Sequence, residues 1–86
     1  MASKKFEKGS MEFQWFGQFW MLVQNYWEQE GENEKYWEDV IEKMNLLVDA
    51  YKVGDQKLWR FSKTMAVAFL SFLENEYKLE KKIHDA

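Results

Sequence analysis

Apolar residues recur every three or four positions along three stretches of the chain, which is the spacing of one face of an α-helix. In the first stretch two such rows run side by side and together make an apolar face of roughly 200°. One row consists of Phe13, Phe16, Trp20, Val23 and Trp27, and the other of Trp15, Phe19, Leu22 and Tyr26. We expect both rows to belong to the hydrophobic core.

The residues that flank this stretch predict the ends of the first helix. Ser10 is a good N-cap, and Glu12 would lie in the first turn, where the helix dipole favours a negative charge. Gly31 readily adopts the left-handed conformation that follows many helices. We therefore expect this helix to end near Glu30.

The second stretch predicts a helix that starts after Asn33 and ends at Gly54. Its expected core residues are Trp37, Val40, Met44, Leu47 and Tyr51, with Ile41 and Val48 alongside. Asp55 can cap the next helix, so the predicted connection is only about two or three residues long. A connection that short favours antiparallel neighbours.

The third stretch predicts a helix from about Gln56 toward Ile83. Its expected central residues are Leu58, Phe61, Met65, Phe69, Phe72 and Leu73, with Trp59, Ala66, Leu70 and Tyr77 on one flank. Burial should weaken beyond Tyr77, where pairs such as Glu74 with Lys78 would support the helix.

Three amphipathic helices with short connections predict an all-α fold, an antiparallel three-helix bundle. No stretch shows the alternation of apolar and polar residues that is typical of strands. We expect residues 1–9 to form a flexible tail and residues 10–86 to form a single domain, because 86 residues suit one small domain.

The composition limits the kinds of site and the cellular location that we expect for the protein. The chain has no cysteine, which excludes disulfides and thiolate metal sites. The first residues lack the apolar core of a secretory signal, and the longest apolar run, Met65–Leu70, is far shorter than the roughly 20 residues that span a bilayer. These features predict a cytoplasmic protein without a membrane role.

The apolar faces are wider than a small bundle can cover, and three apolar residues lie outside them. These are Met21, Leu46 and Val67. A protein partner or a second copy of the chain could bury such an excess. Our first hypothesis is therefore a protein-binding or self-associating helical module that uses these residues.

A group of basic residues near the second connection supports an alternative hypothesis. Lys52, Lys57, Arg60 and Lys63 gather around a helix-turn-helix connection, as residues that contact DNA would. The net charge of -3 and the acidic second helix argue against a nucleic-acid partner.

Metal binding and catalysis have little support in the sequence. The acidic stretch 28–42 lacks the ligand spacing of a calcium loop, and exposed carboxylates usually stay hydrated. The single histidine, His84, has no nucleophile beside it, and no glycine-rich loop could hold phosphate. We expect neither an enzyme nor a cofactor or metal site.

Several short motifs resemble those of small uncharacterised all-helical proteins of Gram-positive bacteria and of their phages or mobile elements. The motifs are Trp15-Phe16, Phe19-Trp20, Tyr36-Trp37 and Val67-Ala68-Phe69-Leu70, and the resemblance covers Met11 to Tyr77. It brings no activity and no site residues, but it implies a bacterial source and favours protein binding.

Overall fold

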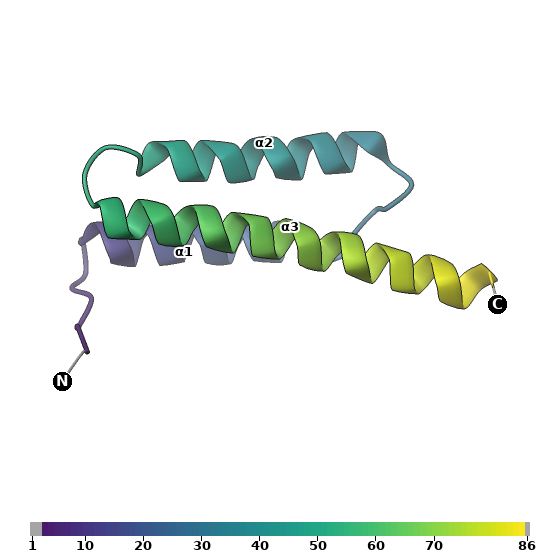
Figure 1. Ribbon diagram of the computed structural model, residues 1–86, viewed down its shortest axis with the longest axis horizontal. Helices are drawn as coiled ribbons and strands as arrows, with labels where there is room; N and C mark the ends of the chain where they lie inside the picture. Colours follow the sequence, from purple (N-terminus) through teal and green to yellow (C-terminus); the bar gives the residue numbers. More distant parts are fainter. Residues whose placement is uncertain (1–2, 86) are drawn as a thin grey trace.

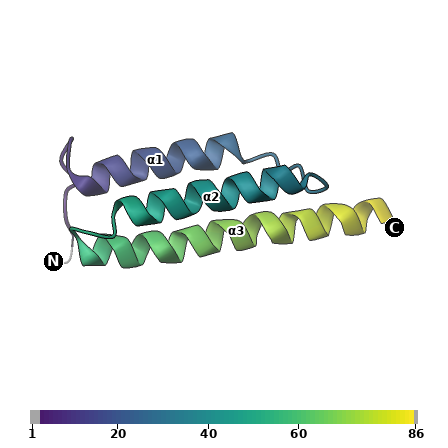
Figure 2. The same ribbon diagram turned by 90° about the horizontal axis from the view of Figure 1, so that it is seen from above.

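The protein folds into three helices, as the sequence predicts. The computed structural model describes residues 3–85, and the side chains of residues 3–82. Helix α1 spans Met11–Asn25, α2 spans Glu34–Ala50 and α3 spans Gln56–Asp85. The chain reverses direction at both loops, so that α2 returns alongside α1 and α3 runs back beside α2 (Figures 1 and 2). The all-α, three-helix prediction is confirmed.

Each helix begins at the cap residue that the sequence indicates. The Ser10 hydroxyl accepts a hydrogen bond from the backbone N–H three residues later, at 3.2 Å. The Asn33 side-chain oxygen accepts from the N–H two residues later, at 3.0 Å. The Asp55 carboxylate accepts from the N–H groups two and three residues later, at 3.0 and 3.2 Å. Each cap satisfies donors that the first turn of a helix leaves unpaired.

The core is two adjoining clusters of buried side chains that draw on all three helices. One contains Tyr36, Val40, Met44, Ala66, Phe69 and Leu73, and the other contains Trp15, Leu47, Tyr51 and Leu58. Trp15 is completely enclosed, and its indole N–H donates to the hydroxyl of the equally buried Ser62 at 2.7 Å. This bond joins α1 to α3 inside the bundle.

The prediction that α1 runs to Glu30 is wrong. The helix ends at Asn25, and the Tyr26 carbonyl accepts a hydrogen bond from the Tyr36 hydroxyl at 2.7 Å. Gly31 does not have a positive φ. Its lack of a side chain matters for packing instead, because an added Cβ would lie 1.9 Å from the ring of Tyr77.

The boundary between α2 and α3 also differs from the prediction. Helix α2 ends at Ala50, and residues 51–55 form a longer connection than expected. Gly54 has a φ of +129°, which a residue with a side chain rarely adopts, so its role is to turn the loop rather than to end the helix.

At the start of α2, the residue that faces the core lies one position earlier than predicted. Tyr36 is buried where Trp37 was expected, and Ile41 is exposed. Trp37 is half-buried, and its indole N–H donates to the Gly31 carbonyl at 3.0 Å. This hydrogen bond to the loop holds Trp37 at the side of the bundle.

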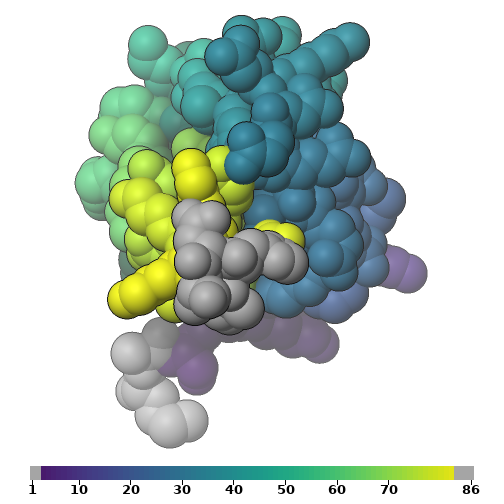
Figure 3. All heavy atoms as spheres, turned by 90° about the vertical axis from the view of Figure 1, so that its right-hand side faces the viewer, coloured from purple at the N-terminus to yellow at the C-terminus, as the bar shows by residue number. Residues whose placement is uncertain are grey.

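Helix α3 continues beyond the other two helices (Figure 1). Tyr77 packs against the loop between α1 and α2, and its hydroxyl donates to Glu32 at 2.8 Å. Further along α3, Glu80 accepts a hydrogen bond from the Gln29 amide of the same loop at 3.3 Å. Figure 3, which views the molecule from that end, shows the yellow-green part of α3 beside the blue loop. The predicted pair of Glu74 with Lys78 is present, with 3.7 Å between the charged atoms.

Candidate functional site

Most of one predicted apolar row lies outside the core. Phe13, Phe16, Trp20 and Trp27 are each between 40% and 63% exposed, although the spacing predicted that they would be buried, and only Val23 of this row packs against the core. The row that begins with Trp15 faces the other helices instead. A helix in a three-helix bundle has only two neighbours, so α1 can turn one of its rows toward them but not both.

Two aromatic side chains of α3 adjoin the exposed row. Phe61 and Phe72 were expected at the centre of α3, but they are 39% and 42% exposed. The rings of Phe16 and Phe61 are 5.7 Å apart, and Trp27 stacks on Phe72 at the same distance. The α1–α3 seam therefore carries aromatic rings on its outer side as well as in the core.

We refer to the six exposed rings of this seam as the aromatic face. It consists of Phe13, Phe16 and Trp20 of α1, Trp27 of the loop that follows α1, and Phe61 and Phe72 of α3. Helix α2 contributes none of these rings. At one end, Phe6 from the segment before α1 stacks on Phe16 with the ring centres 5.6 Å apart, and Lys4 forms an ion pair with Glu12.

The aromatic face is large for a protein of this size. A fully enclosed aromatic side chain buries about 150 to 250 Å², so the six exposed fractions leave roughly 400 to 700 Å² of ring surface in water. The largest apolar patch on a typical monomeric protein covers about 300 to 600 Å² and is often functional.

The stretch of chain that carries the rings of α1 and of the following loop is uncharged. Residues 13–27 include no Lys, Arg, Asp or Glu, although charged residues make up 31% of the chain. The exposed polar residues of this helix are glutamine and asparagine. A charge-poor, aromatic surface is the composition found at the centre of protein–protein interfaces.

The three residues predicted as a partner surface are exposed but scattered. Met21, Leu46 and Val67 lie on α1, α2 and α3 respectively, and each is more than half exposed. Leu46 and Val67 stand among polar residues of their own helices, whereas Met21 lies one turn from Gly17 on α1. The aromatic face was not predicted from the sequence, because helical spacing assigned both aromatic rows to the core.

The predicted basic group is also on the surface. Lys52, Lys57 and Arg60 are exposed, and the Lys63 ammonium lies 3.8 Å from the centre of the Trp59 ring. That cation–π contact holds Lys63 against the protein. Helices α2 and α3 run alongside each other in Figures 1 and 2, whereas a DNA-binding helix-turn-helix has helices that cross at about 90 to 120°.

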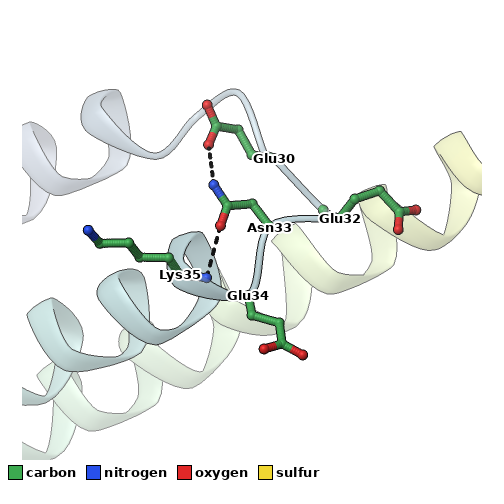
Figure 4. Close-up of a pocket in the computed structure, with 6 residues that line it drawn as sticks. Glu30, Glu32, Asn33, Glu34 and Lys35 are labelled. Carbon is green, nitrogen blue, oxygen red and sulfur yellow. Dashed lines mark hydrogen bonds between the residues drawn. The ribbon is translucent and has the colours of Figure 1, made fainter.

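The acidic stretch does not converge on a point. In Figure 4, Glu30 accepts a hydrogen bond from the Asn33 amide at 3.2 Å, while Glu32 and Glu34 point away from it. Among the residues whose side chains the structure describes, no group of three acidic, histidine or cysteine residues is placed to hold a metal ion. His84 lies outside those residues.

A tyrosine–carboxylate pair connects the end of α1 to α2. The Tyr26 hydroxyl donates to Asp39, and this hydrogen bond, together with burial, raises the pKa of Tyr26 to about 12. Hydrogen bonding to a carboxylate favours the neutral phenol because the phenolate cannot donate. The pair links the end of α1 to α2 through a side-chain hydrogen bond.

Comparisons of the chain with protein-family models, curated proteins and solved structures give no match. Over the described residues, no helix combines the length and apolar character needed to cross a bilayer.

Proposed function

We propose that the protein is a small helical module that binds another polypeptide through the aromatic face. The observation that carries the proposal is the set of six rings, between 39% and 63% exposed, along the outer side of the α1–α3 seam. Each Å² of apolar surface that a partner removes from water contributes about 25 cal/mol to binding, so covering this face would be favourable.

The residue types support a binding role over a purely structural one. Tryptophan is enriched among the residues that dominate binding energy, and two of the five tryptophans, Trp20 and Trp27, are on this face and more than half exposed. Neither is needed to fill the core, which Trp15 and the residues around it already occupy.

DNA binding through Lys57, Arg60 and Lys63 is the alternative function, and it is supported only by their exposure on α3. Phosphate binding depends on a broad positive surface and weakens steeply with salt. Duplex DNA at low salt should therefore show no shift in electrophoretic mobility. A shift that disappears when all three residues are replaced by Glu would instead establish this alternative.

Site-specific photocrosslinking in cells tests the proposed interaction. A benzophenone side chain in place of Phe13 would lie on the aromatic face, and the same group in place of the exposed Thr64 on α3 is the matched control. We expect polypeptide adducts from position 13 and few from position 64. Equal labelling at both positions, or no adduct at either, would contradict a role for the face in protein binding.

A further inference from the structure

We propose that the partner on the aromatic face is a second copy of this chain, with α1 of one copy crossing α1 of the other close to Gly17. This inference rests on the proposed function and names its partner. Four observations support it: the exposed area, the absence of charge in residues 13–27, the position of the acidic residues of α2 and the open space above Gly17.

The area matches a dimer of modest affinity. Stable, specific interfaces bury about 1,200 to 2,000 Å² in total. The exposed rings of one copy supply roughly 400 to 700 Å², so two copies facing each other bury about 800 to 1,400 Å² from the rings alone. Side chains at the edge of the contact would add to this figure. The face is therefore large enough for a symmetric dimer at the lower end of the usual size range.

The charge distribution suits a contact between identical surfaces. In a two-fold dimer the same patch lies on both sides, so every charge on it would approach its own copy. Residues 13–27 carry no charge, so this problem does not arise along that stretch, and Glu12 at the start of α1 is paired with Lys4. An uncharged stretch also offers no electrostatic attraction to a strongly charged partner.

The acidic residues of α2 lie away from the face. Each copy has a net charge of -3, and the acidic side chains of α2 include Glu38, Asp39 and Glu42. Since α2 contributes nothing to the aromatic face, a dimer formed through α1 and α3 keeps the two acidic helices on its outside. Like charges are then separated by the bundle and by solvent, which screens them.

We expect the α1 helices of the two copies to approach each other most closely at Gly17. It lies inside α1, where glycine is less favourable than alanine, and a Cβ added to it would meet nothing within 4 Å. The fold of a single copy therefore gives no reason for glycine at this position. Phe13 and Trp20 are one turn away on the same side of α1, so a helix crossing over Gly17 would pack between two large rings.

Sedimentation velocity across micromolar to millimolar concentrations tests the proposal. We expect the mass of the wild-type chain to rise with concentration from 10.5 kDa toward twice that value. Gly17→Gln fills the open space with a good helix former, and Trp20→Gln removes the most exposed ring of the face. Each should raise the dissociation constant of the dimer at least about tenfold.

The control variants distinguish weaker association from a loss of folding. Asn45→Gln changes an exposed residue of α2 and should leave the dissociation constant within about twofold of the wild type. Gly17→Ala, a smaller change in the same place, should weaken the dimer less than Gly17→Gln while melting no lower than the wild type in dilute solution. Circular dichroism of each variant checks that its helices are intact.

Three results would overturn the second-copy proposal. One is a strict monomer over the whole concentration range, and another is a Gly17→Gln variant that associates as the wild type does. The third is flotation of a monomeric chain with phosphatidylcholine–phosphatidylglycerol vesicles that depends on Trp20, because the face would then meet lipid. Crosslinks from position 13 to a different protein, without dimers, would remove the second copy as partner but leave the proposed function standing.

Discussion

The hydrogen bond between Trp15 and Ser62 offers the sharpest test of how the bundle is held together. Both side chains have no exposed surface, and the indole N–H donates to the hydroxyl at 2.7 Å. Ser62→Ala removes the acceptor and leaves the N–H buried without a partner, which costs about 1 to 3 kcal/mol. An 86-residue domain has a total stability of roughly 4 to 13 kcal/mol, so the loss is a large share.

Thermal and urea denaturation of four chains would measure this effect. We expect Ser62→Ala to lower Tm by about 5 to 20 °C, since each kcal/mol shifts Tm by about 4 to 8 °C in a domain of this size. In a Trp15→Phe background there is no indole donor, and the same change should then cost less than about 0.5 kcal/mol. The difference between the two backgrounds isolates the hydrogen bond from the shape of the core.

Ser71→Ala is the matched control, because Ser71 is an exposed serine of the same helix. Its effect should stay within about 0.5 kcal/mol of zero. If Ser62→Ala were as mild as Ser71→Ala, or equally harmful with and without the indole, the claim that this bond stabilises the α1–α3 contact would be refuted.

Two further predictions concern other contacts of the bundle. Gly31→Ala should destabilise the fold by about 1 to 3 kcal/mol, because its Cβ would lie 1.9 Å from the ring of Tyr77, and Tyr77→Ala in the same chain should recover part of that loss in urea denaturation. Gly17→Ala, where nothing lies within 4 Å, should instead stabilise a single copy by up to about 1 kcal/mol, and equal effects at the two glycines would contradict this account. The raised pKa of Tyr26 means that the folded state holds its proton more tightly than the unfolded state does, so the stabilisation is complete below pH 10 and is lost as the pH rises through about 12. The pKa of Tyr26, followed through its phenolate absorbance, should fall toward 10 in Asp39→Asn; an unchanged titration would show that the carboxylate is not the cause.

The sequence was sufficient to predict the number of helices and where each begins. Local chemistry determines those features, since a cap such as Ser10 or Asp55 bonds to backbone only two or three residues away. The end of α1 was not predictable in this way. It depends on the Tyr36 hydroxyl and on the ring of Tyr77, which are far along the chain from the residues they contact.

The aromatic face could not be predicted from the sequence for a related reason. Helical spacing identifies a wide apolar face, but it does not tell which row of α1 meets its neighbours. Trp15 and Phe16 are adjacent in sequence, yet one is enclosed and the other is 40% exposed. The tertiary arrangement decides between them, because two neighbouring helices cover only part of a face of roughly 200°.

The contact of Tyr77 with the loop also divides α3 into two parts with different dynamics. Residues 78–82 are exposed, and apart from the exposed hydrogen bond between Gln29 and Glu80, these turns are held mainly by their own backbone hydrogen bonds. Fraying of these turns should stop where the ring of Tyr77 rests on Gly31. Amide protons before Tyr77 should therefore exchange with solvent only when the bundle opens, whereas those after it should exchange within the folded protein.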